Sequence, residues 1–155
     1  MARRMRTLKQ LLAGKPQAIH SIGPDASVFE ALSLMAEHDV GAVMVFEAGK
    51  VAGILTERDY ARKGILTGRL SKDTAVREIM TPEVIFANFD KSIEECMAIM
   101  TGGRFRHLPV MEGGRLIGIV SMRDLVREII DFQRHTIEDL RRDMITVMTP
   151  DPSSY

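Results

Sequence analysis

The chain has 155 residues, enough for one ordinary hydrophobic core or for two small lobes that share one. Its hydrophobic content of 45% is that of a globular protein and excludes a disordered chain. Lys plus Arg and Asp plus Glu both number 21, and this neutral balance argues against broad electrostatic binding to nucleic acid or to an anionic membrane.

The first 15 residues form a basic N-terminal segment with an amphipathic helical pattern at Thr7–Leu12. No apolar run approaches the roughly 18–20 residues of a membrane span, and no long apolar region follows the early arginines, as an export signal would require. Cys96 is the only cysteine, so no intrachain disulfide can form, and we expect it to be a small buried core residue. These features predict a cytoplasmic protein.

One stretch of the sequence occurs twice, 65 residues apart and without a gap. Asp25–Asp59 aligns with Asp90–Asp124, and 11 of the 35 positions are identical. A short repeat usually cannot bury its own apolar face, so we expect the two copies to pack on each other. Two related copies create a pseudo-twofold axis with two related clefts, and we expect function to lie in those clefts.

The first copy, residues 16–66, has the pattern β-α-β-β-α. Its helix has apolar residues at helical spacing, with Ser27 as a predicted N-cap and Glu30 completing a capping box. A short turn with a glycine predicts a hairpin between the second and third strands. The expected elements are an extended segment at Ala18–Ile22, a helix at Ser27–Glu37, strands at Val40–Phe46 and Val51–Leu55, and a helix from about Thr56.

The second copy, residues 80–130, repeats this order, so the predicted fold class is α+β with α/β-type layers. Its expected elements are Val84–Ala87, a helix at Ser92–Met100, strands at Arg106–Met111 and Leu116–Val120, and a helix from about Ser121.

Three further segments complete the predicted organisation. Residues 67–79 should form the linker between the copies, and residues 131–155 a C-terminal helix at Asp131–Met144 with a frayed tail at Asp151–Tyr155. Met148-Thr149-Pro150 resembles the start of a further repeat, and either a remnant or a dimer contact would explain it. Most of the 11 methionines lie on predicted core faces, where they would act as deformable filler.

The best preserved part of the repeat is Gly53-Ile-Leu-Thr56-Glu-Arg58-Asp59, which recurs as Gly118-Ile-Val-Ser121-Met-Arg123-Asp124. Ser/Thr-x-x-Asp is also a helix capping box, and a plain cap is the alternative interpretation. A glycine inside an apolar strand, however, often marks the close approach of another backbone or a ligand. A helix N-terminus favours phosphate, a carboxylate there suits the two hydroxyls of a ribose, and the arginines could pair with phosphates.

The doubled unit resembles a tandem pair of cystathionine-β-synthase (CBS) domains, a Bateman module, over about Pro16–Ile130. The segments that carry the resemblance are Met80-Thr81-Pro82, Arg106-His107-Leu108-Pro109-Val110 and the two Gly-x-x-Thr/Ser-x-x-Asp endings. The chain is also similar to small stand-alone bacterial CBS proteins. The resemblance implies a non-catalytic regulatory module that binds an adenosine nucleotide such as AMP, ADP, ATP or NAD, and that forms a homodimer and acts on a downstream protein. No metal and no nucleic acid are expected.

The resemblance further implies that each cleft combines the ending of one copy with the opening segment of the other. The first cleft would be lined by His20, Ser21, Val40, Gly41, Ala42, Ser121, Arg123 and Asp124. The second would be lined by Thr56, Arg58, Asp59, Ile85, Phe86, Phe105, Arg106, His107 and Pro109. The aspartates would hold the ribose, and backbone groups of the two central strands would contact the adenine.

The copies differ at one place, where Gly41 and Ala42 stand opposite Arg106 and His107. We therefore expect two unequal sites, with the cleft nearer Arg106 more cationic. The alternative function is a constitutive dimeric scaffold without a nucleotide site. An enzyme is disfavoured because no convincing general base or nucleophile is present, and the four histidines show no metal-ligand spacing.

Overall fold

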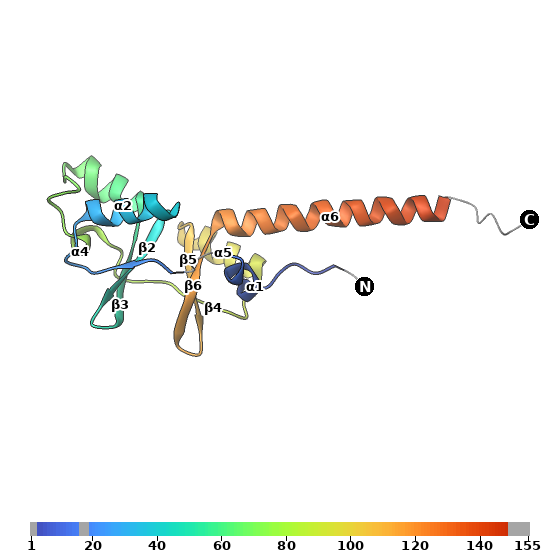
Figure 1. The fold of residues 1–155 in the computed structure, drawn as a ribbon, viewed down its shortest axis with the longest axis horizontal. Coiled ribbons are helices and arrows are strands. Elements are labelled where there is room, and N and C mark those ends of the chain that lie inside the picture. The colour runs from blue at the N-terminus through green and yellow to red at the C-terminus, as the bar shows by residue number, and fades with distance from the viewer. Residues whose placement is uncertain (1–2, 16–18, 149–155) are drawn as a thin grey trace, which may run out of the picture.

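The computed structural model describes residues 3–15 and 19–148 and confirms the two repeats (Figure 1). Each repeat has a three-stranded mixed sheet in which the first strand is parallel and the third antiparallel to the middle one. The first sheet comprises β1 (Ser21–Ile22), β2 (Ala42–Glu47) and β3 (Lys50–Thr56), and the second β4 (Ala87–Asn88), β5 (His107–Glu112) and β6 (Arg115–Ser121). The predicted α+β class is correct, although residues 16–18 of the first extended segment lie outside the described residues.

The central helices of the two repeats, α2 (Val28–His38) and α5 (Ile93–Gly103), begin at the predicted caps. In α2, the Glu30 N–H donates to Ser27 Oγ and the Ser27 N–H donates to Glu30 Oε2, both at 3.1 Å. Both helices run further than predicted and end at a residue in the left-handed conformation, Asp39 or Arg104. Cys96 and Met100 are fully buried on α5, as expected of core residues.

The two sheets pack face to face, which explains why their central strands read as continuous apolar runs. Val43 and Val45 of β2 point into the core of the first repeat. The alternate residues Ala42 and Met44 point the other way and join Ile54 and Ile119 in a cluster between the repeats. A strand buried on both faces needs no polar alternation. The predicted pseudo-twofold packing of the copies is therefore correct.

A short helix from outside each repeat completes the core of the opposite repeat. Helix α1 (Leu8–Ala13) precedes the first repeat, yet its three leucines are buried in the core of the second. Helix α4 (Val76–Ile79) precedes the second repeat, and its Val76 and Ile79 are buried in the core of the first. The segment 67–79, which we expected to be a linker, thus contributes to a core. The apolar stretch of α4 spans only four residues, too few for helical periodicity to reveal it.

The final helices of the two copies differ greatly in length. In the first copy, α3 (Glu57–Asp59) continues as a π-helical turn, η1 (Tyr60–Gly64), and a 3₁₀ turn, η2 (Ile65–Thr67), which ends at left-handed Gly68. In the second copy, α6 (Met122–Met148) is one helix of 27 residues that projects beyond the repeats (Figure 1). The predicted helix at Asp131–Met144 is present but is not a separate element, because no Gly or Pro interrupts the chain between Ser121 and Met148. The predicted frayed tail and Thr149-Pro150 lie outside the described residues.

No helix in the described part of the chain is long and apolar enough to cross a membrane.

The backbone at Gly53 lies directly against the backbone at Thr81, as the position of a glycine inside an apolar strand indicated. The Ile54 and Thr81 backbones exchange hydrogen bonds of 2.9 and 2.8 Å, and a Cβ added to Gly53 would lie 2.7 Å from the Thr81 carbonyl oxygen. Gly53→Ala should therefore lower the free energy of unfolding by about 1–3 kcal/mol, the usual cost of overpacking. Urea denaturation would measure the change.

Gly102→Ala is the matched control, because a Cβ at Gly102 meets nothing within 4 Å and alanine favours the helix. The close-contact explanation is wrong if Gly53→Ala is as stable as Gly102→Ala.

Candidate functional site

Two clefts open between the repeats, with volumes of about 940 Å³ for the first and about 740 Å³ for the second. The shared wall between them is formed by residues of both copies, and six residues line both clefts: Gly41, Arg58, Arg104, Phe105, Arg106 and His107. The two predicted sites are therefore neighbours rather than independent pockets.

The first cleft gathers seven of its eight predicted residues: His20, Val40, Gly41, Ala42, Ser121, Arg123 and Asp124. The exception is Ser21, which does not line the cleft and is exposed elsewhere. Successive side chains of an extended segment point to opposite sides, so a segment that turns His20 into the cleft turns Ser21 away.

The second cleft gathers eight of its nine predicted residues: Thr56, Arg58, Asp59, Ile85, Phe105, Arg106, His107 and Pro109. Phe86 is the exception, and it follows Ile85 as Ser21 follows His20. The same alternation therefore explains both misplaced residues.

Each cleft contains the start of a helix whose cap is complete. The Ser121 N–H donates to Asp124 Oδ2 at 2.7 Å, and the Asp124 N–H donates to Ser121 Oγ at 3.1 Å. Thr56 and Asp59 form the same reciprocal pair at 3.0 and 3.1 Å. Both aspartates are thus helix caps, and any ligand they bind must share a carboxylate that already has this structural role.

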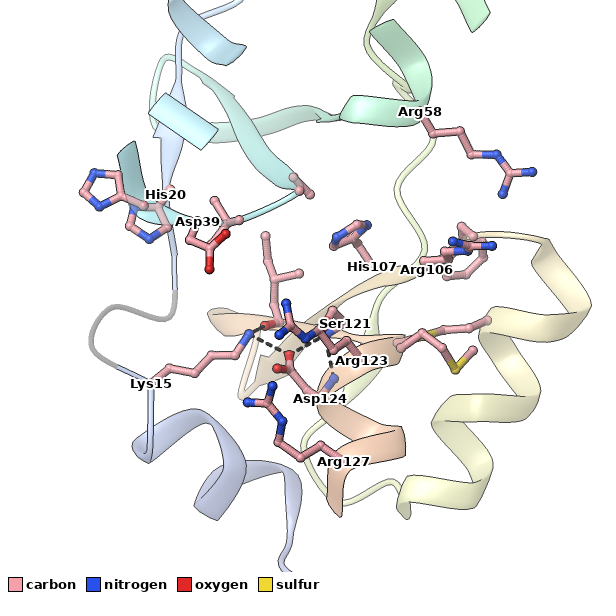
Figure 2. Close-up of a pocket in the computed structure, with 18 of the residues that line it drawn as sticks. Lys15, His20, Asp39, Arg58, Arg106, His107, Ser121, Arg123, Asp124 and Arg127 are labelled. Carbon is pink, nitrogen blue, oxygen red and sulfur yellow. Dashed lines mark hydrogen bonds and ion pairs between the residues drawn. The ribbon is translucent and has the colours of Figure 1, made fainter. Parts of the chain in front are cut away.

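Lys15, from the segment that follows α1, reaches into the first cleft (Figure 2). Its Nζ lies 2.7 Å from Asp124 Oδ2 and donates to the Ile119 carbonyl at 2.9 Å. Burial alone would raise the pKa of Asp124, but the hydrogen bond from Lys15, the Ser121 N–H and the charge of Lys15 together hold that pKa below its usual value. Asp124 is therefore ionised at neutral pH.

Asp59 in the second cleft has more partners than Asp124. Its Oδ1 accepts from Thr81 Oγ1 at 3.2 Å and lies 3.1 Å from Lys63 Nζ, while its Oδ2 accepts from the Thr56 N–H. Both contacts of Asp124 converge on Oδ2, so its Oδ1 accepts no hydrogen bond from the described residues. The first cleft therefore offers a carboxylate oxygen that the second does not.

Gly41 of the first copy lies beside His107 of the second. A Cβ added to Gly41 would lie 3.1 Å from Nε2 of His107, so the imidazole occupies the space that glycine leaves. A side chain at position 41 would require the imidazole to shift, so the glycine permits this close contact between the copies.

The charge of the clefts differs from the prediction. Six Lys and Arg side chains and two carboxylates line the first cleft, against five and three for the second. Arg106 was predicted to make the second cleft the more cationic one, but it lines both clefts and therefore cannot distinguish them. The first cleft gains Lys15, Arg123 and Arg127, whereas the second adds Glu57 and Glu83. Both clefts suit an anion, and the first more so.

Two histidines of the first cleft, His20 and His107, have lowered pKa values that favour the neutral ring. Burial, and then the charge of Lys15, lower the pKa of His107. Burial, the neighbouring His38 and Lys15 lower the pKa of His20, whose ring stacks on His38 at a centroid distance of 4.1 Å. A neutral His107 carries no positive charge that could pair with a phosphate.

The described residues contain neither a reactive thiol nor a cluster of metal ligands. Burial, and then the charge of Glu95, raise the pKa of the Cys96 thiol to about 11, so it is an inert core residue. No three His, Cys, Asp or Glu side chains of the described residues come together as a metal site.

Sequence reasoning missed the lysines that neutralise the two aspartates. Lys15 lies outside the repeat, and no periodicity could connect it with Asp124. Lys63 follows Asp59 by four residues on a predicted helix, and that spacing could have identified it. Arg104 and Thr81 were also missed, since each enters its cleft from a loop whose path depends on the packing of the repeats.

The CBS domain family matches this chain twice, at residues 17–65 and 76–131, and the chain belongs to that family. The pair of repeats is therefore a tandem CBS module, a regulatory unit without catalytic chemistry of its own.

The chain is similar to several members of the family. It is 40% identical over 121 residues to the mitochondrial CBS domain-containing protein CBSX3 of Arabidopsis thaliana, a match that covers 75% of this chain and 59% of the plant protein. A solved CBS-domain protein from Burkholderia ambifaria MC40-6 is 46% identical with a TM-score of 0.77, covering 81% of this chain and 95% of that one. The CBS domain pair of protein MJ0100, solved with 5′-methylthioadenosine and S-adenosyl-L-methionine, is 27% identical with a TM-score of 0.67, covering 79% of this chain and 98% of that one.

The lowered pKa values of His20 and His107 predict a stability that depends on pH. Below about pH 6.5 the unfolded chain binds protons that the folded chain does not, so the free energy of unfolding should fall as the pH is lowered from about 7.5 to 5.5. Urea denaturation across this range measures the fall. His107→Gln should reduce it, and an equal fall in the variant and the wild type would contradict the assignment.

Proposed function

We propose that the two clefts bind phosphorylated adenosine ligands such as AMP, ADP, ATP or NAD, and that the module uses them as regulatory signals. The observation that carries the proposal is a carboxylate beside a helix N-terminus, present in both clefts and surrounded by an excess of cationic side chains. Carboxylates accept both hydroxyls of a ribose, while N-terminal amides and arginines favour phosphate.

The complex of the MJ0100 domain pair supports adenosine as the common part of the ligand. The two ligands of MJ0100 carry no phosphate, however, and the clefts of this chain contain more cations than carboxylates. S-adenosylmethionine has a positive sulfonium group that such a cleft repels, whereas phosphates gain from it. We therefore propose a nucleotide rather than a sulfonium ligand.

In the first cleft, Asp124 Oδ1 would accept a ribose hydroxyl while Oδ2 keeps the cap and Lys15. The phosphates would lie toward the arginines, of which Arg123 and Arg127 come from the first turns of α6 and Arg106 from the shared wall (Figure 2). The Val40 N–H already donates to the Met35 carbonyl and the Gly41 carbonyl already accepts from the Glu57 N–H, so an adenine edge would have to contact the other backbone groups of Val40–Ala42. A ligand in this position touches both repeats, so its binding can favour one relative orientation of the repeats over another.

A scaffold without ligand is the second candidate function. It is favoured by the complete hydrogen bonding of Asp59, whose two oxygens are engaged with Thr56, Thr81 and Lys63. A module of this kind would bind its protein partner with an affinity that nucleotide does not change.

Asp124→Asn tests the ribose contact. The amide keeps an oxygen for the helix cap but loses the charge, and hydrogen bonds to charged groups contribute about 1.5–3 kcal/mol. We expect nucleotide affinity in the first cleft to fall by roughly 10- to 100-fold, measured by isothermal titration calorimetry with ATP, AMP and S-adenosylmethionine.

Glu95→Gln is the matched control, since Glu95 completes the capping box of α5 with Ser92 and lines neither cleft. It loses the same charge at an equivalent cap and should bind nucleotide as the wild type does. Wild-type affinity in Asp124→Asn would show that the carboxylate is only a cap.

The two clefts should fill in order. Asp124 Oδ1 accepts no hydrogen bond from the described residues and lies in a more cationic surrounding, whereas Asp59 must release Thr81 or Lys63 to receive a ribose. Calorimetry should resolve a tight and a weak phase, with Asp124→Asn removing the tight phase and Asp59→Asn the weak one. The reverse assignment of the two phases would overturn this ranking.

A further inference from the structure

The carboxylate of Asp39 lines the first cleft and has no structural partner among the described residues. Asp39 ends α2 in the left-handed conformation, at a φ of 52°, and its N–H donates to the Ala36 carbonyl at 3.4 Å. The backbone of this residue therefore terminates the helix, while its side chain takes no part in the cap. By contrast, Asp124, the other carboxylate of the cleft, is engaged with its own cap and with Lys15. Both oxygens of Asp39 are thus available to a ligand.

The first cleft is polarised between a carboxylate end and an arginine end. Asp39 and His20 lie at one end of it, whereas Arg58 and Arg106 lie at the other (Figure 2). A phosphate is repelled by the Asp39 carboxylate and attracted by the arginines. In the proposed nucleotide complex, with the ribose at Asp124, the phosphates therefore lie toward the arginines and the base lies toward Asp39.

The aromatic side chains at the Asp39 end also suit a base better than a phosphate. The ring of His20 stacks on that of His38 at a centroid distance of 4.1 Å, and both residues line the cleft. Burial, more than any other cause, lowers the pKa of His20 and so favours its uncharged form. Flat, uncharged rings are surfaces on which nucleic-acid bases stack.

The backbone that follows Asp39 offers one acceptor and one donor. The Val40 N–H and the Gly41 carbonyl are already bonded, to Met35 and Glu57 respectively. The Val40 carbonyl and the Gly41 N–H are not engaged by a backbone hydrogen bond among the described residues. Adenine has an amino donor at C6 with ring nitrogens that accept beside it, so its edge matches these groups.

We propose that Asp39 selects the base in the first cleft by accepting a hydrogen bond from the exocyclic amino group of adenine. This inference rests on the proposed nucleotide function and adds the side chain that discriminates between purines. Hypoxanthine has a carbonyl oxygen at C6 in place of the amino group. That oxygen would face the Asp39 carboxylate, and two acceptors without a hydrogen between them repel.

The second copy has the opposite charge at the equivalent position. Arg104 lies 65 residues after Asp39 and also ends its helix in the left-handed conformation, at a φ of 59°. A guanidinium only donates hydrogen bonds and therefore cannot accept one from an amino group. The preference for a 6-amino purine is thus expected of the first cleft and not of the second.

Asp39→Asn tests the contact by isothermal titration calorimetry with AMP and IMP, whose purines differ at C6. Asparagine tolerates the left-handed conformation, so the variant should fold. Its amide donates as well as accepts and can therefore face either purine. In an Asp59→Asn background, which weakens the second cleft, AMP should bind roughly 10- to 100-fold more tightly than IMP. Adding Asp39→Asn should remove most of this preference.

Glu37→Gln in the same background is the matched control. Glu37 is exposed on α2, two residues before Asp39, and lines neither cleft. Its variant loses the same charge and should keep the preference for AMP. Equal binding of AMP and IMP before either substitution overturns the inference, as does a preference that survives Asp39→Asn or is lost in both variants. Each of these results leaves the nucleotide function standing, whereas binding of neither ligand overturns that function and base selection with it.

Discussion

The exchange of short helices between the repeats is the packing constraint on which the clefts depend. Helix α1 buries its leucines in the second repeat and α4 buries Val76 and Ile79 in the first, so the chain must cross between the sheets twice. These crossings carry Lys15 to Asp124 and Thr81 to Asp59. The apolar burial of helices remote from the clefts thus determines which polar groups meet inside them.

The two clefts show how a duplicated unit becomes asymmetric. Each helix start keeps the same reciprocal cap, yet the lysine that neutralises the aspartate comes from a different element in each cleft, the end of α1 or the turn after α3. Where the loops meet, His107 occupies the space beside Gly41, and a Cβ at position 41 would require the imidazole to shift. Symmetry therefore persists in the backbone and fails where the side chains share a common space.

Helix α6 connects the first cleft to the free surface of the molecule. Its first turns carry Asp124 and Arg127, which line the cleft, and its outer half carries exposed apolar residues. Because a helix is rigid over this length, a tilt imposed at its first turn displaces its far end.

The repeat, the capping boxes and the apolar strands could be read from the sequence, because they follow from local periodicity and from residue types at fixed spacing. These features yielded the fold class, and the resemblance to CBS domains implied 17 lining residues, of which 15 line the clefts. The sequence could not reveal which helix completes which core, since three leucines in α1 fit either repeat equally well by composition. Only tertiary packing decided that Lys15 neutralises Asp124, that His107 is held neutral and that the first cleft is the more cationic. Each of these depends on distances between segments that have no fixed spacing in the chain.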